Sequence, residues 1–138
     1  MVVRVPVQWA DMDAYGHVNN TVFLRFFETA RIAYLERCGL VESMKEHGIG
    51  AILHSTYCRF RKPIVFPDEV LVGARVIDTR PDRFTHQYRV YSTSQDAVAA
   101  EGEGIIVSYN YHDNVKVELP ERVRTAIKAI ESRSATGD

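Results

Sequence analysis

The sequence predicts an α+β domain in which a curved antiparallel sheet of about five strands wraps around one long central helix. Three observations support this fold class. A run of apolar residues at helical spacing follows a first strand, segments with alternating apolar residues come after it, and short turns join these segments. A single long apolar helix and one sheet can bury each other only if the sheet curves around the helix.

The first segment, residues 2–9, places Val3, Val5 and Val7 on one side, which is typical of a strand. Pro6 lacks the N–H that an inner strand would donate, so we expect this strand at an edge of the sheet.

The second segment, residues 20–38, has helical spacing, and Gly39 is a suitable end. Most of its apolar side chains fill one broad arc. Burying each of its phenylalanines contributes about 1.5–3 kcal/mol. A smaller apolar group, interrupted by Glu28, lies on the opposite side and consists of Leu24, Ile32 and Leu35. The helix therefore has two apolar faces, and we expect it to lie between the sheet and a further element, such as a second subunit.

Four further strands are predicted from alternation and from β-branched and aromatic content, at residues 51–62, 69–79, 84–93 and 98–111. The breaks between them are short and rich in turn-forming residues, so successive strands should be antiparallel neighbours. Pro120 favours the start of a terminal helix. We expect one domain over residues 1–133, followed by a flexible tail at 134–138.

Composition excludes several classes of protein. Apolar residues make up 46% of the 138 residues and charged residues 25%, with a net charge of -1. This balance is typical of a globular domain and provides no basic field for nucleic acid. Cys38 and Cys58 lack the spacing of a disulfide framework or a zinc site, so we expect them to be reduced and buried. Because the sequence has no signal-like leader and no run of about eighteen apolar residues, we expect no membrane span and a cytoplasmic location.

Polar chemistry is concentrated in one stretch, DMDAYGHVNN, at residues 11–20. Gly16 and the asparagines are explained by a turn and a helix cap, but two carboxylates are not. We expect free N–H groups at Asn20 and Thr21 to form a donor site for a carbonyl oxygen that gains negative charge. A carboxylate facing that site, Asp13, could attack an acyl carbonyl or act as general base on water.

The other polar side chains admit two interpretations. His17 could orient a substrate or the carboxylate, and Tyr15 could supply a hydroxyl, but either could be a packing residue. We expect Asp11 to be exposed and uninvolved. Glu28 should be partly buried and paired, with Arg31 or with a charge on another subunit. The remaining histidines lack metal-ligand spacing, so no metal site is predicted; they are His47, His54, His86 and His112.

The order of these residues resembles a known family. The series Asp13, Gly16, His17, Val18, Asn19 and Asn20, followed by Phe23, Phe27, Glu28 and Arg31, is similar to hotdog-fold thioesterases of the 4-hydroxybenzoyl-CoA thioesterase type. Acyl-ACP thioesterases share a closely similar DxDxxxHVNN string. The resemblance spans the whole chain in the order of elements, but its specific part is residues 9–31, and RFRKPIVFPDEV is a weaker second match.

The resemblance implies roles for individual residues. Asp13 matches the family's catalytic carboxylate, and the Asn20 N–H matches the donor that polarises the thioester carbonyl. His17 and the position of Tyr15 match a histidine and an asparagine implicated in the acyl-ACP enzymes. Because Tyr15 departs from that asparagine, the scheme of the acyl-CoA enzymes is favoured. Family members are dimers or tetramers with active sites between subunits, so we expect a homodimer or homotetramer.

These observations together predict hydrolysis of acyl-CoA thioesters to a carboxylic acid and coenzyme A. Coenzyme A would enter as part of the substrate, and no bound cofactor is expected. A related branch of the fold carries its catalytic carboxylate on the helix, so Glu28 is the second candidate. The alternatives are an acyl-ACP thioesterase and a noncatalytic acyl-CoA-binding module. The expected substrate contacts are Tyr15, Asn19, Phe23, Arg59, Arg61 and Lys62. The basic residues among them, and also Arg80 and Arg83 at a turn, could bind the phosphates of coenzyme A or could be solvated surface charges.

Overall fold

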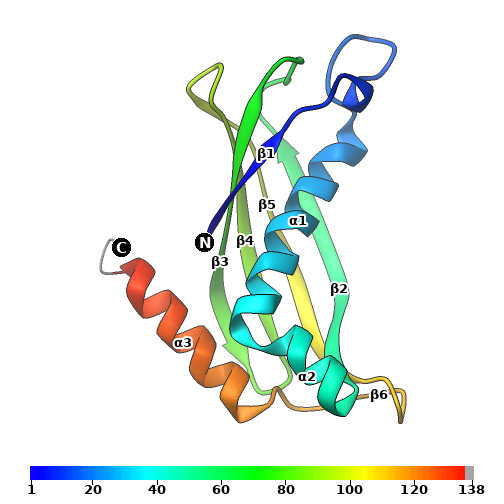
Figure 1. The fold of residues 1–138 in the computed structure, drawn as a ribbon, viewed down its shortest axis with the longest axis vertical. Coiled ribbons are helices and arrows are strands. Elements are labelled where there is room, and N and C mark those ends of the chain that lie inside the picture. Colours follow the sequence, from blue (N-terminus) through cyan, green and yellow to red (C-terminus); the bar gives the residue numbers. More distant parts are fainter. Residues whose placement is uncertain (136–138) are drawn as a thin grey trace.

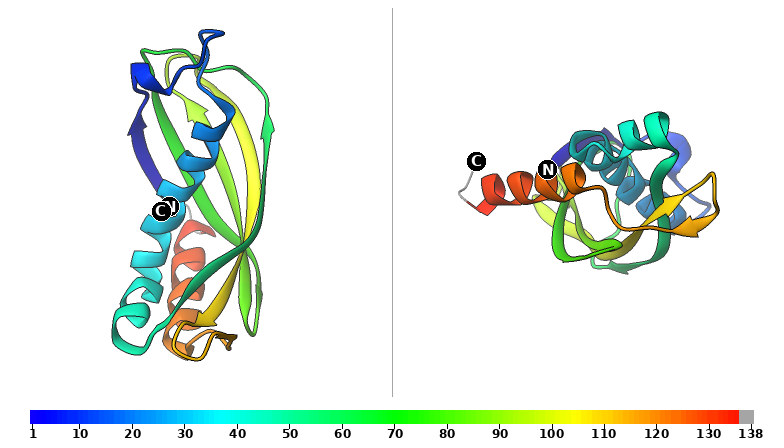
Figure 2. Two further views of the ribbon diagram at one scale, coloured as in Figure 1. Left: turned by 90° about the vertical axis from the view of Figure 1, so that its right-hand side faces the viewer. Right: turned by 90° about the horizontal axis from the view of Figure 1, so that it is seen from below.

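One long helix lies in the concave face of a curled antiparallel sheet (Figure 1). The structure, a computed structural model, describes residues 1–135. Its elements in chain order are β1 (Val2–Pro6), the 3₁₀ helix η1 (Trp9–Asp11), α1 (Asn20–Cys38), α2 (Leu40–His47), β2 (Ile49–Phe60), β3 (Glu69–Arg80), β4 (Arg83–Ser92), β5 (Ala97–Asn110), β6 (Val115–Lys116) and α3 (Glu121–Ala135). The predicted α+β architecture is confirmed, and Figure 2 shows the curl of the sheet around α1.

Helix α1 has the predicted bounds because local signals set both of its ends. The Asn19 side chain caps its first turn, and Gly39 ends it in the left-handed conformation at φ 90°. One face is fully buried and includes Phe26, Phe27 and Tyr34. The opposite face is uncovered in the single chain apart from Leu35, since Leu24 is 41% exposed and Ile32 46% exposed.

The concave face of the sheet makes room for the aromatic side chains that α1 and β4 bring to it. Phe27 stacks on Tyr88 of β4 with 4.7 Å between ring centroids. A Cβ atom at Gly102 would lie 2.1 Å from the Tyr57 carbonyl oxygen and 2.6 Å from the Phe27 ring. Glycine is therefore needed at this position of β5, because any side chain would displace the helix or the neighbouring strand.

The strand order differs from the prediction. It is β1-β3-β4-β5-β2, with β6 on β5, so β2 pairs with β5 and not with β3. The short connection between β2 and β3 joins opposite sides of the sheet. Alternation identifies strands but carries no information about which strands pair over long distances.

Three elements were not predicted, namely η1, α2 and β6, and some boundaries differ: the strand expected at residues 2–9 ends at Pro6, and the strand expected at 51–62 is Ile49–Phe60. Helix α2 begins directly after Gly39 and has only eight residues, too few for a clear helical period; β6 has two residues. Helix α3 continues to Ala135, so the first two residues of the predicted tail are helical, and residues 136–138 lie outside the described residues.

The two edges of the sheet are unlike each other. The edge strand β1 has five residues, contains Pro6 as predicted, and carries Arg4 paired with Glu69 at 2.5 Å. The edge strand β2 has twelve residues, most of them exposed, among them Leu53 and Tyr57. A long edge with apolar side chains is a template for pairing with another strand.

Candidate functional site

The loop between η1 and α1 is held closed by its own main chain. The Asp13 N–H donates to the His17 carbonyl oxygen at 2.9 Å, and the Gly16 N–H donates to the Asp13 carbonyl oxygen at 3.0 Å. Gly16 has φ 80°, which favours glycine, and Met12 forms a β-bridge with Val18 at the base of the loop. These bonds fix the position from which the Asp13 side chain projects.

The Asp13 carboxylate is only partly occupied by protein partners. Its Oδ1 accepts the Tyr15 N–H at 2.9 Å, and Oδ2 has no hydrogen-bond partner among residues 1–135. The side chain is half-buried. One carboxylate oxygen is thus positioned by the loop while the other is available to a bound molecule.

The first turn of α1 leaves one backbone donor free. The Asn19 Oδ1 accepts the Thr21 N–H at 3.0 Å and the Thr21 hydroxyl at 3.0 Å. The prediction of a free Thr21 N–H was therefore wrong, because the cap that starts the helix uses it. Across residues 1–135, the Asn20 N–H has no acceptor.

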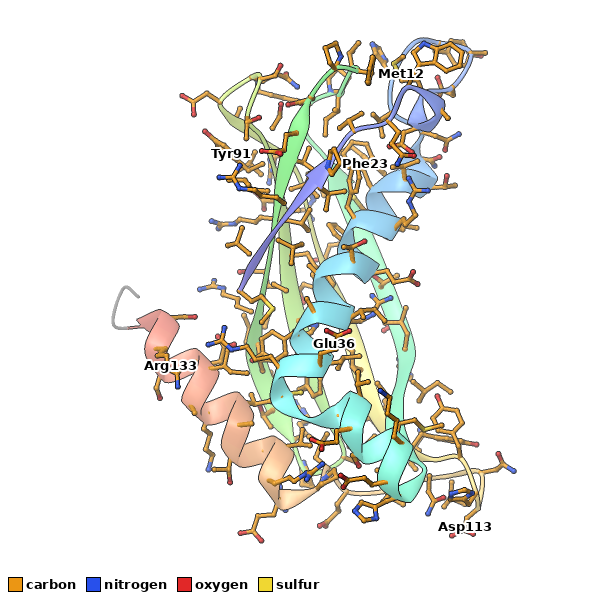
Figure 3. All side chains as sticks on the ribbon, in the orientation of Figure 1. Met12, Phe23, Glu36, Tyr91, Asp113 and Arg133 are labelled. Atoms are coloured by element: carbon orange, nitrogen blue, oxygen red, sulfur yellow. The ribbon has the colours of Figure 1, made fainter. Side chains whose placement is uncertain are left out.

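A cavity of about 470 Å³ brings most of the predicted site residues together. Phe23 and Phe60 form its apolar part, with ring centroids 5.1 Å apart. Figure 3 shows Phe23 near the start of α1, below the loop that carries Met12. The lining residues are Asp13, Tyr15, His17, Val18, Asn20, Phe23, Phe60, Arg61, Lys62 and Pro63. Asp13 and Asn20 thus line one cavity.

Several predicted contacts are not part of this cavity. Asn19 is not among the lining residues, since its side chain caps the helix. Arg59 borders a separate hollow of about 180 Å³ with Glu101 and Glu103, because alternate residues of β2 face opposite sides. Arg80 and Arg83 flank the β3–β4 turn and pair with Asp78 and Asp82.

Phe60, Val18 and Pro63 line the cavity but were not among the predicted site residues. Phe60 is the last residue of β2. Since adjacent residues of a strand face opposite sides of the sheet, the sequence could have indicated that Phe60 and Arg59 lie on different faces. Tyr15 is 89% exposed and lies at the rim, as does the exposed His17. Arg61 pairs with Glu101 at 3.2 Å.

Asp11 is buried, contrary to the prediction that it is exposed. Its Oδ2 accepts the Gln8 N–H at 2.9 Å, and its Oδ1 accepts from Arg25 of α1 at 2.5 Å. Both oxygens are occupied by these partners, and the absence of Asp11 from the chemistry stays a prediction. Asp11 attaches the loop to α1, and this long-range pair has no local sequence signal.

Glu28 and Arg31 lie in the middle of α1, outside the cavity. Their charged groups are 3.8 Å apart, but Glu28 is 61% exposed, so the expected partial burial does not occur within the single chain. Arg31 is 12% exposed and donates to the Tyr88 hydroxyl at 3.5 Å.

His86 is buried in the core and has a structural position. Its Nδ1 lies 3.1 Å from the Tyr88 hydroxyl, and its Nε2 has no partner within the described part of the chain. Burial, and secondarily the Arg31 charge, lowers the pKa of His86 to about 3. The imidazole is therefore neutral in the fold at ordinary pH.

The cysteines differ in burial. Cys38 is buried, and Cys58 is half-buried on β2, where burial raises the pKa of its thiol to about 11. Both are free. Among residues 1–135, no group of three or more His, Cys, Asp or Glu side chains could hold a metal ion. No helix in that range has the length and apolar character needed to cross a membrane.

The model of the thioesterase-like superfamily matches residues 7–127. A thioesterase of Thermus thermophilus, crystallised with coenzyme A and zinc, is 32% identical with a TM-score of 0.83, covering 96% of this chain and 94% of its own. The long-chain acyl-CoA thioesterase FadM of Escherichia coli is 29% identical over 76 residues, which cover 55% of this chain and 58% of FadM. A chloroplastic acyl-acyl carrier protein thioesterase of Arabidopsis thaliana is 24% identical over 89% of this chain and 65% of its own length.

Proposed function

The chain belongs to the thioesterase-like superfamily and is a thioester hydrolase with the hotdog fold, and we propose that its substrates are acyl-CoA thioesters hydrolysed at the cavity below the Asp13 loop. The observation that carries the proposal is that Asp13 and Asn20 line the same cavity, and that the Asn20 N–H has no acceptor among residues 1–135. A carboxylate beside a free donor is the pair that attack on an acyl carbonyl requires.

In the proposed reaction the thioester oxygen accepts the Asn20 N–H, which stabilises the negative charge that develops there. Asp13 acts through Oδ2, the oxygen without a hydrogen-bond partner in residues 1–135. As a nucleophile it would form an acyl-aspartyl anhydride and release the coenzyme A thiolate, and water would then hydrolyse the anhydride. As a general base it would take a proton from water as that water attacks the carbonyl carbon. Both routes yield the carboxylic acid and the free thiol.

The remaining cavity residues have supporting roles in this proposal. Phe23 and Phe60 would contact the first part of the acyl group. Arg61 and Lys62 line the cavity and are exposed, and their charges suit the phosphates of coenzyme A. Tyr15 and His17 would contact the substrate from the rim. Coenzyme A is proposed to enter only as part of the substrate, with no bound cofactor, and a cytoplasmic location stays a prediction.

The test is the Asp13→Asn variant assayed by release of free thiol from a panel of acyl-CoAs. Asparagine keeps an oxygen for the Tyr15 N–H but cannot attack or take a proton, so we expect turnover to fall by about 10²–10⁴-fold with the fold unchanged. Asp113→Asn, at the opposite end of the molecule (Figure 3), is the matched control and should retain full activity. Near-normal hydrolysis by Asp13→Asn would refute the assignment.

The same assay separates the alternatives. An acyl-ACP thioesterase would hydrolyse an acyl group faster on carrier protein than on coenzyme A. A noncatalytic binding module would bind acyl-CoA saturably and release no thiol from any member of the panel. The acyl-CoA assignment is favoured here by the charges of Arg61 and Lys62 in the cavity lining and by Tyr15 in place of the asparagine expected for the carrier-protein enzymes.

We also propose that two copies of the chain pair through the exposed edge of β2. Its apolar side chains Leu53 and Tyr57, like Leu24 and Ile32 of α1, are about 40–49% exposed in the single chain. An isologous pair would bury them and satisfy the free backbone groups of the edge. Light scattering should give at least twice the 15.7 kDa chain mass, and a monomer at micromolar concentration would exclude this assembly.

A further inference from the structure

A second hollow, of about 230 Å³, lies on the convex face of the sheet. Its polar lining residues are Arg75 of β3, Gln87 and Arg89 of β4, and Ser134 near the end of α3. No acidic side chain of residues 1–135 lines it. It shares no lining residue with the cavity below the Asp13 loop, so nothing in the proposed reaction uses it.

The register of β3 and β4 brings two arginines to the same part of the sheet. Gly73 pairs with Arg89, and Arg75 pairs with Gln87. Ala74, between the two paired positions of β3, is buried, so the other four residues lie on the convex face. Diagonal neighbours on one face of an antiparallel pair lie about 7–8 Å apart, within reach of long side chains. One small ligand can therefore contact both guanidinium groups.

The two guanidinium groups have no acidic partner within residues 1–135. The Arg75 Nε donates to the Gln87 Oε1 at 2.7 Å, which leaves its two Nη atoms without an acceptor there. Arg89 has no hydrogen-bond or ion-pair partner in the same part of the chain. Glu101 and Glu103 of β5, the carboxylates on this face, are paired with other side chains. Like charges on neighbouring strands repel each other, and a bound anion would remove this repulsion.

Gly73 leaves the space between the arginines open. A Cβ atom built at this position would lie 3.8 Å from the Met1 carbonyl oxygen, and no other atom beyond its chain neighbours would be as close. Packing therefore does not require glycine here, in contrast to Gly102. The missing side chain instead keeps the hollow open to a ligand.

We propose that this hollow binds the phosphate group of a small anionic ligand between Arg75 and Arg89. A guanidinium group presents paired N–H donors that match two phosphate oxygens, and charge-assisted bonds of this kind are stronger than neutral ones. Because the Gln87 Oε1 accepts from Arg75, its NH₂ group remains a donor, and the Ser134 hydroxyl can donate from the end of α3. The chemistry recognised is a phosphate group, carried by an inorganic anion or by a nucleotide.

Isothermal titration calorimetry of the intact chain at low ionic strength tests the site, with pyrophosphate and AMP as separate titrants. We expect saturable binding of at least one of them with a Kd below about 10 mM. Arg89→Gln and Arg75→Gln should each raise this Kd at least about tenfold, because each removes charge-assisted hydrogen bonds. Lys128→Gln, which removes an equal charge from the exposed side of α3, is the matched control and should leave the Kd unchanged. Tighter binding of pyrophosphate would identify an inorganic ligand, and tighter binding of AMP a nucleotide.

Two results of the titration would overturn the proposal. The first is that the wild type binds neither anion. The second is that either arginine variant, folded by circular dichroism, keeps the wild-type Kd. In that second case loss of binding in Lys62→Gln would place the anion in the cavity below the Asp13 loop.

A built-in carboxylate provides a second test that needs no ligand. Gly73→Glu places a carboxylate between the two guanidinium groups, and Gly73→Gln is the matched control with the same shape and no charge. At low salt the melting temperature of Gly73→Glu should exceed that of Gly73→Gln by about 2–4 °C, and 1 M salt should abolish the difference. Equal melting temperatures at low salt would show that the arginines do not share this space, and the proposal would be refuted.

Discussion

Replacing Asn20 by proline would remove the proposed oxyanion donor and little else. Proline has no backbone N–H and is well tolerated at the first position of a helix, the position of Asn20 in α1. It also requires an extended residue before it, and Asn19 already has φ -60° and ψ 142°. The Asn20 N–H donates to no group among residues 1–135, so no protein hydrogen bond is lost.

The expected effect is therefore large on turnover and small on stability. Removing one donor from an oxyanion site lowers kcat about 10²–10³-fold, equivalent to about 2.7–4 kcal/mol. The free energy of unfolding should change by less than about 1 kcal/mol, since the cap by Asn19 on Thr21 is retained. Thiol release gives kcat, and urea denaturation gives the free energy of unfolding.

Asn20→Ala is the matched control, because it removes the side chain and keeps the N–H. It should retain turnover close to the wild type. Binding of free coenzyme A, which has no acyl carbonyl, should be equal in both variants. If folded Asn20→Pro turns over within about threefold of Asn20→Ala, the N–H is not the donor and the reasoning from the helix start is refuted.

Three further changes test the framework around the site. Because the pKa of His86 is lowered in the fold, the unfolded chain binds a proton at a higher pH than the folded chain, and the free energy of unfolding falls as the pH drops below about 6.5. Between pH 7 and pH 5 the wild type should lose about 2 kcal/mol of its free energy of unfolding, whereas His86→Phe should not show this loss; urea denaturation at both pH values measures the difference. Asp11→Ala should lower the free energy of unfolding by about 1–3 kcal/mol, because the Gln8 N–H loses its acceptor; an unchanged denaturation midpoint would contradict this. Gly102→Ala should cost at least about 1–3 kcal/mol because its Cβ would overlap the Tyr57 carbonyl, and a melting temperature equal to the wild type would show that β5 can shift freely.

The sequence predicted those features that local signals specify. The bounds of α1 follow from Asn19 and Gly39, which act on the residues next to them. The position of Asp13 before the helix is likewise local, because the loop closes on itself. The presence of four long strands after the helix follows from alternation alone.

The features that were missed depend on contacts between distant residues. The pairing of β2 with β5 joins strands that β3 and β4 separate in the chain, so no turn between neighbouring segments indicates it. Burial of Asp11 depends on Arg25, fourteen residues away, and the exclusion of Arg59 from the cavity depends on which side of β2 faces α1. The Thr21 N–H was expected to be free because the prediction placed the cap at Asn19 or Asn20 without assigning its acceptor.

The loop that carries Asp13 has a consequence for how this protein can vary. Its shape is maintained by main-chain bonds among residues 12–18, whereas the side chains of Ala14 and Tyr15 project outward and are exposed. Substitutions at these two positions can alter what the rim of the cavity touches without moving the carboxylate. In the proposed function, selectivity and reactivity would be carried by separate parts of one short loop, and mutation libraries at Ala14 and Tyr15 would offer a route to new substrates with the proposed catalytic geometry preserved.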